Sequence, residues 1–268
     1  MGWYKRIIAK MYTCLPGQCN LLLLNLRKAN KEITMETAPM LSGQTQIRVN
    51  QFIRSVYNWM AIGLGLTGIV AFYVSNNQYL TQLIFGNRLL FFALIIGELV
   101  LVFSIAARVN KMQASTATGL FVLYAVLNGA TLSFIFLVYT RTSISSVFFI
   151  CAATFVACSI YGMTTKRDLT SLGGFMMMGL IGIIIASVVN IFVRSTQMSM
   201  IISYIGVFVF VGLTAYDTQK LKTMALSVPD GSEGGMVRKN AILGALALYL
   251  DFVNLFLMLL RIFGSSRD

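Results

Sequence analysis

The chain has 268 residues, of which 57% are hydrophobic and only 11% are charged, and its formal net charge is +12. A soluble domain is rarely so apolar, and the long apolar runs predict a single all-α polytopic membrane bundle. The sequence contains no histidine, which excludes HExxH metalloproteases, Ser-His-Asp hydrolases and His-ligated haem proteins. The basic residues are not accompanied by a nucleic-acid-binding motif. We therefore expect no enzyme, no cofactor and no nucleic-acid partner.

The chain begins with a polar, basic stretch, residues 1–54, which we predict to be a disordered cytoplasmic tail because it contains no membrane span. Residues 55–264 are predicted to form a seven-helix membrane domain, and residues 265–268 a short external tail. Each apolar segment has about 18–23 residues, enough to cross about 30 Å of hydrocarbon. The seven predicted spans are Val56–Val74, Leu89–Ala106, Thr118–Tyr139, Ile144–Met163, Leu172–Val193, Ser199–Gln219 and Ala241–Phe263.

Lysine and arginine are divided unevenly between the two sides that seven spans define. With the N-terminus inside the cell, 16 of the 21 basic residues fall on the cytoplasmic side. The short loops alone, without the N-terminal tail, show the same bias, with 8 against 5. The positive-inside rule therefore predicts a cytoplasmic N-terminus and an external C-terminus.

Helix contacts inside a bilayer favour small residues, because apolar burial alone does not drive helices together in lipid. The first predicted span offers Ala61 and Gly65, which are four residues apart. The fifth span offers Gly182 and Ala186 at the same spacing. We expect both pairs to lie on helix contact faces.

Three of the nine acidic residues lie inside or at the edge of predicted spans, namely Glu98, Asp217 and Asp251. A carboxylate at membrane depth usually faces a partner, a cavity or a pathway. Asp251 shares a helical face with Asn254, and this face is expected to point into the bundle. Counted from the cytoplasmic helix ends, Asp251 lies about 15 Å deep and Asp217 about 9 Å deep. The two can therefore meet only if the helices tilt or the seventh helix starts late.

One interpretation makes Asp217 and Asp251 partners. Two carboxylates close together in a low dielectric cannot both ionise cheaply, so they share a proton and form a pH-dependent latch. Arg108 is expected at the level of Asp217, and Glu98 at the level of Asp251. Buried acids with few counter-charges also attract divalent cations, so Glu98, Asp217 and Asp251 are candidates for transient calcium binding.

A second interpretation treats the two aspartates as unrelated. Asp217 would then be an interfacial residue that caps a helix or pairs with Lys220 or Arg108. Asp251 would be held by Asn254 and other hydrogen bonds. The residue chemistry alone leaves both interpretations open.

Several segments resemble the Bax inhibitor family of membrane proteins, and in particular its bacterial inner-membrane branch. GLTAYDTQKLK and the later ILGALALYLDFVNLFLMLLRIFG are similar to the family's C-terminal signature. YGMTTKRDL and GLIGIIIASVVN also resemble bacterial members. The resemblance covers residues 46–264; these four motifs lie at Gly212–Lys222, Ile242–Gly264, Tyr161–Leu169 and Gly179–Asn190.

The resemblance implies a bundle in which two groups of three helices surround a central C-terminal helix. It also implies a pH-sensitive calcium leak gated by an aspartate pair, which by motif is Asp217 and Asp251. An arginine on the second helix accompanies that pair, and Arg108 is the nearest match. The implied partners are the lipid bilayer of the bacterial inner membrane and calcium ions. Some members are instead described as modulators of a membrane-bound protease, so an interaction protein is the alternative.

An intramembrane aspartyl protease is a third possibility, because the aspartates fall on consecutive helices and Tyr216-Asp217 matches the YD of that class. The second aspartate, however, ends the sequence Leu248–Asp251, which is LYLD and not GxGD. No PAL motif follows, since the only prolines are Pro16, Pro39 and Pro229. The pattern therefore disfavours proteolysis.

Overall fold

The computed structural model describes the backbone of residues 18–109, 111–227 and 234–267, and the side chains of residues 46–109, 111–226 and 234–267. The chain divides into two compact units, Met1–Asn50 and Gln51–Asp268. The helices are α2 (Gln18–Asn76), α3 (Gln78–Gly86), α4 (Arg88–Arg108), α5 (Ala114–Leu132), α6 (Ile135–Val138), α7 (Arg141–Thr164), α8 (Thr170–Val193), α9 (Thr196–Ser227) and α10 (Gly234–Phe263).

The N-terminal tail differs from the prediction over part of its length. We expected disorder through residue 54, but the backbone is helical from Gln18 onward as part of α2. Leucine, lysine, methionine and glutamate, which have high helix propensity, are frequent in Leu21–Met35. Residues 1–17 lie outside the described part of the chain.

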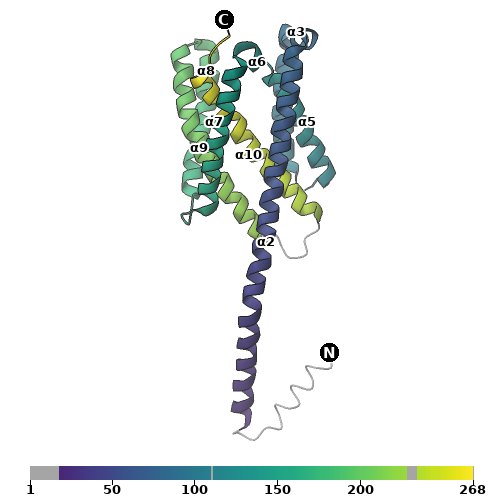
Figure 1. The fold of residues 1–268 in the computed structure, drawn as a ribbon, viewed down its shortest axis with the longest axis vertical. Helices are drawn as coiled ribbons and strands as arrows, with labels where there is room; N and C mark the ends of the chain where they lie inside the picture. Colours follow the sequence, from purple (N-terminus) through teal and green to yellow (C-terminus); the bar gives the residue numbers. More distant parts are fainter. Residues whose placement is uncertain (1–17, 110, 228–233, 268) are drawn as a thin grey trace. The chain divides into compact units, whose positions relative to one another are not determined.

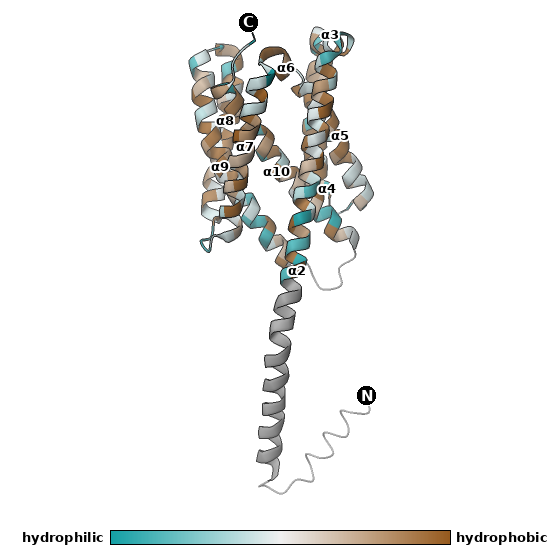
Figure 2. Ribbon diagram, in the orientation of Figure 1, coloured by the Kyte–Doolittle hydropathy of each residue, from teal (hydrophilic) through white to brown (hydrophobic). Residues whose placement is uncertain are grey.

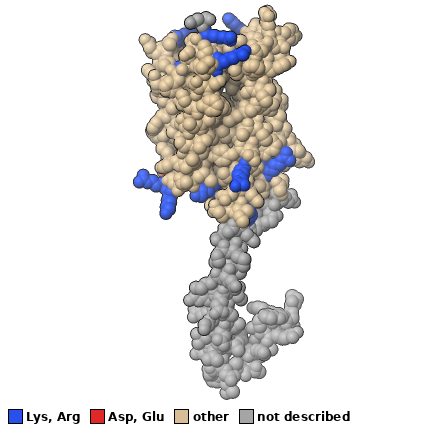
Figure 3. Space-filling view, in the orientation of Figure 1, with Lys and Arg blue, Asp and Glu red and all other residues tan. Residues whose placement is uncertain are grey.

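The seven predicted spans are confirmed. Seven helical segments in the described residues are long and apolar enough to cross a membrane, and the third combines α5 with the short α6. Hydrophobic residues run along these helices (Figure 2), and lysine and arginine gather at the two ends of the bundle (Figure 3). The protein is thus an all-α, multi-pass membrane protein. The side that faces the cytoplasm stays a prediction from the charge count.

Polar residues fix several helix ends at the edges of this apolar band. Asn87 begins α4 by accepting hydrogen bonds from the amides of Leu89 and Leu90, and Thr140 caps α7. After α8 the chain turns at Arg194, whose φ of 55° lies in the left-handed region. The Asn190 side chain accepts a hydrogen bond from the backbone amide of Ser195, the residue after Arg194. This tight turn lets α9 run back beside α8.

Helix α10 forms the centre of the bundle. It is the most buried of the seven spans and packs against α9, α7, α5 and α4. Helices α7, α8 and α9 lie on one side of α10, and α2, α4 and α5 on the other (Figures 1 and 2). The central helix also runs obliquely across the bundle (Figure 1). This arrangement agrees with the architecture that the family resemblance implied.

The expected small-residue contact faces are corrected by the structure. A Cβ placed on Gly65 or Gly182 would meet no atom within 4 Å, so neither glycine sits in a helix crossing. Close approach occurs instead at Gly129, where a Cβ would lie 2.7 Å from the Thr67 carbonyl oxygen. Gly162 is similarly close to the backbone of Ala215. Small residues four apart occur on lipid-facing surfaces too, so spacing alone did not identify the crossings.

Replacing Gly129 by alanine is expected to lower stability by about 1 kcal/mol, because the new methyl group must displace the α2 backbone. Gly119→Ala on the same helix is the matched control, since a Cβ there meets nothing within 4 Å. The free energy of unfolding can be measured by SDS titration in mixed micelles. Equal stability of the two variants would contradict a close crossing of α2 and α5 at Gly129.

Candidate functional site

Asp251 is held inside the bundle by the central helix. Its side chain is only 5% exposed, and α10 places it among the buried residues Leu248, Phe252 and Leu255. One carboxyl oxygen, Oδ2, has no hydrogen-bond partner among the described residues. A buried polar atom without a partner is costly and therefore rare in folded proteins. This unpartnered oxygen makes Asp251 a candidate for a functional role.

Asp217 lies on α9, the helix that packs most extensively on α10. It is half-buried, and its carboxyl group is the charged neighbour that acts on Asp251. The Thr218 hydroxyl next to it is fully buried and also lacks a hydrogen-bond partner among the described residues. The two aspartates thus lie on helices that pack together, near enough for the Asp217 carboxyl group to act electrostatically on Asp251.

The tilt of α10 explains how residues at different counted depths come to interact. Asp217 lies 10 residues before the end of α9 at Ser227, and Asp251 lies 17 residues after the start of α10 at Gly234. In upright helices these separations would put the aspartates about 10 Å apart in height. Because α10 crosses the bundle obliquely, each of its residues adds less height along the bundle axis than a residue of an upright helix would (Figure 1). The difference in height between Asp217 and Asp251 is therefore smaller than this value.

Arg108 and Asn254 were expected to support the aspartate pair. Arg108 is exposed at the C-terminal end of α4, and its guanidinium makes no hydrogen bond or ion pair with either aspartate. The cation that acts on Asp217 is instead Lys220, one helical turn further along α9. Asn254 is half-buried and donates a hydrogen bond to the Leu250 carbonyl of its own helix, at 2.8 Å. Among the described residues, neither side chain forms a hydrogen bond or an ion pair with the two aspartates.

Glu98 belongs to a different part of the bundle. Helix α4 packs on α5, and Glu98 accepts hydrogen bonds from Thr131 at 2.8 Å and Asn128 at 3.4 Å. The described residues do not gather three metal-ligating side chains at one place, so the structure does not unite Glu98 with the two aspartates. The sequence analysis placed Glu98 at the same membrane depth as Asp251. Depth alone does not show which neighbour a side chain faces, and α4 packs on α5 whereas α9 packs on α10.

The Glu98 contacts continue into a buried network that the sequence reasoning missed. The Tyr249 hydroxyl, on α10 two residues before Asp251, donates to Asn128 Oδ1 at 3.2 Å. It also lies 2.6 Å from the Thr67 hydroxyl of α2. Four helices are thus joined through side chains. An asparagine within an apolar span was the available signal, because such amides bond between helices.

Comparison with known proteins shows the family of this chain. The family described as "Inhibitor of apoptosis-promoting Bax1" matches residues 49–268. The chain belongs to the Bax inhibitor family. Its membership confirms the resemblance carried by the motifs around Asp217 and Asp251.

Bacterial relatives match over most of their length. "Inner membrane protein YbhL" of Escherichia coli (strain K12) is 50% identical over 224 residues, which cover 84% of this chain and 95% of the relative. An uncharacterized protein of Borreliella burgdorferi is 45% identical over 219 residues, or 82% of this chain and 94% of the relative. An uncharacterized protein of Deinococcus radiodurans is 41% identical over 235 residues, which cover 88% of this chain and 99% of the relative.

Proposed function

We propose that this Bax inhibitor family protein is a pH-sensitive calcium leak whose gate is the pair Asp217 and Asp251. The observation that carries the proposal is the buried Asp251 carboxyl group, with an unpartnered oxygen and Asp217 as its charged neighbour. Two such groups in a low dielectric share a proton, and gain or loss of that proton changes the repulsion between α9 and α10. Protonation is thereby coupled to helix packing.

Calcium chemistry fits a transient site better than a storage site. Calcium in tight sites is surrounded by six to eight oxygens, whereas two carboxylates offer at most four. A conduction pathway needs binding that is strong enough for entry and weak enough for release. Asp217 and Asp251 supply negative charge, and Lys220 is the cation acting on Asp217. An ion would therefore be attracted to the pair but not retained.

The proposed location is the bacterial inner membrane, with the N-terminus in the cytoplasm and the C-terminus outside. The Escherichia coli relative is named an inner membrane protein, which supports location in that membrane. The distribution of lysine and arginine supports the orientation of the two termini. The bilayer and calcium are the proposed partners.

Calcium flux through the purified protein in liposomes tests this function. We expect a calcium leak whose rate changes between acidic and alkaline pH, because the shared proton is gained or lost in that interval. Protein-free liposomes are the control. If the protein carries no calcium at any pH, the leak is ruled out, and the alternative is a non-channel protein that modulates a membrane-bound protease or stress response.

A further inference from the structure

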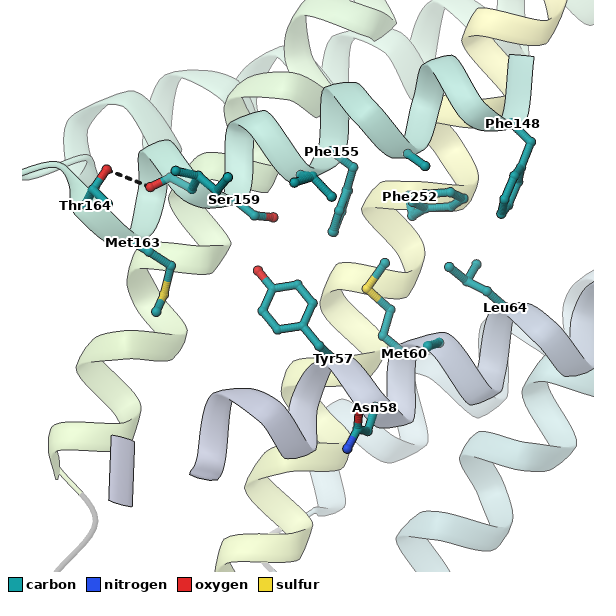
Figure 4. Close-up of a pocket in the computed structure, with 14 residues that line it drawn as sticks. Tyr57, Asn58, Met60, Leu64, Phe148, Phe155, Ser159, Met163, Thr164 and Phe252 are labelled. Atoms are coloured by element: carbon teal, nitrogen blue, oxygen red, sulfur yellow. Dashed lines mark hydrogen bonds between the residues drawn. The ribbon is translucent and has the colours of Figure 1, made fainter. Parts of the chain in front are cut away.

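A groove that opens toward the membrane runs between α2 and α7. Its deeper part is a hollow of about 660 Å³ with walls from α2 and α7 and a floor that includes Phe252 of α10 (Figure 4). A second hollow, of about 800 Å³, continues along α2. The two share Ala61, Leu64 and Phe148, so they form one continuous groove. Ala61 and Gly65, the exposed small residues of α2, line this groove.

Two hydroxyl groups in this groove have no hydrogen-bond partner among the residues whose side chains the structure describes. Ser159 of α7 is 6% exposed, and its Oγ makes no hydrogen bond to any described residue. The buried Tyr57 hydroxyl of α2 likewise has none. Both side chains point into the space between the two helices (Figure 4). Because buried hydroxyls are normally hydrogen-bonded, their arrangement indicates a ligand that brings a hydrogen-bond acceptor.

The position of the hydroxyls along the membrane defines the shape of that ligand. Ser159 lies five residues before the end of α7 at Thr164, which is about 8 Å along the helix. Phe148 lies eleven residues before Ser159, about 16 Å further along the same helix and seven residues from its start at Arg141. The acceptor group is therefore near one membrane surface, and an extended apolar body runs from it across the middle of the bilayer. This polarity is that of a membrane lipid.

We propose that the groove binds one acyl chain of a glycerophospholipid from the surrounding bilayer. The ester carbonyl accepts hydrogen bonds from Tyr57 and Ser159, and the chain lies along Leu64, Phe148 and Phe252. The residues that line the deeper hollow carry no charge, so an ionised fatty-acid carboxylate would be buried without a cation. A neutral ester avoids this penalty. The bound lipid fills the space that separates α2 from α7.

Photo-cross-linking identifies the occupant directly. The full-length protein is placed in vesicles of phosphatidylethanolamine and phosphatidylglycerol, with a trace of phosphatidylglycerol that carries a diazirine in one acyl chain. After illumination, mass spectrometry locates the labelled peptides. We expect adducts concentrated in residues 57–64 and 148–160. Adducts spread evenly over all lipid-facing helices, or an absence of adducts from these two segments, would overturn the proposal.

Two sets of variants test the binding mode. Ala152→Phe fills the deeper hollow, whereas Ala153→Phe adds the same ring at an exposed neighbouring position outside it. We expect labelling of the groove peptides to fall at least about tenfold only in Ala152→Phe, because the added ring occupies the volume of the chain. Unchanged labelling in Ala152→Phe would refute the site.

The hydroxyl contacts are tested without adding bulk. The double variant Tyr57→Phe with Ser159→Ala is expected to weaken groove labelling about fivefold, as loss of two hydrogen bonds to a neutral acceptor would do. Tyr161→Phe, on the same face of the membrane but exposed and outside the groove, is the matched control. If labelling is the same in the double variant and the control, the hydroxyls do not hold the lipid and the proposal fails.

Discussion

Asp251→Asn and Asp217→Asn are each expected to remove the pH dependence of calcium flux. Asparagine keeps the shape of aspartate and a hydrogen-bonding group, but it cannot share a proton with the remaining carboxyl group. Since Asp251 is 5% exposed and Asp217 is its charged neighbour, loss of either carboxylate also removes the repulsion between α9 and α10. Flux through the variants should therefore stay at one level from acidic to alkaline pH.

Asp168 provides a matched control for these variants. It lies between α7 and α8, outside the spans, where the Thr170 hydroxyl and then the Thr170 amide donate hydrogen bonds to it. These bonds hold the pKa of the Asp168 carboxyl below its usual value, so it remains ionised to a lower pH than a free aspartate and does not titrate near neutrality. Asp168→Asn should keep the pH profile of the wild type. Unchanged profiles in both Asp217→Asn and Asp251→Asn would refute the latch, even if calcium still leaked.

Asn128→Ala is expected to reduce the free energy of unfolding by about 3 kcal/mol. The Asn128 amide connects Glu98, Tyr124 and Tyr249, and its removal leaves buried polar groups with fewer partners. Hydrogen bonds between membrane helices contribute less than 2 kcal/mol each, roughly, so the loss reflects several bonds together. SDS titration of the purified protein gives the change.

Asn254→Ala is the comparison for that measurement. Asn254 is an amide in the same membrane region, but its side-chain hydrogen bond goes to the Leu250 carbonyl of its own helix. We expect its replacement to cost about 1 kcal/mol or less. If the two alanine variants were equally stable, the network around Asn128 would not hold the helices together.

The sequence allowed the spans and the two aspartates to be predicted, for reasons that differ. Apolar runs of membrane-spanning length are read directly from hydropathy, and aspartates within them are rare enough to stand out. The rotation of each helix about its own axis was harder to predict from the sequence, because the lipid-facing and the buried surfaces of a membrane helix are both apolar. Gly65 therefore looked like a contact residue, and Glu98 was grouped with Asp251 by depth, although it bonds to Thr131.

The two unpartnered hydroxyls of the groove could not be found from sequence at all. Tyr57 on α2 and Ser159 on α7 are 102 residues apart in the sequence, and each is unremarkable in its own segment. Their common property is the empty space that both face (Figure 4). Such a space depends on helix tilt and separation, which are set by the packing of the whole bundle.

The central helix α10 follows the other six spans in the sequence, so the centre of the bundle is completed last. The ribosome makes α10 after the six spans that flank it, and domains form during synthesis in N- to C-terminal order. Until α10 inserts, Thr67 and Asn128 have no Tyr249 to bond, and Asp217 has no Asp251 beside it. The nascent protein thus passes through a stage with six spans in the membrane and a polar, unfilled interior. The proposed gate can therefore form only after insertion of the helix that carries half of it.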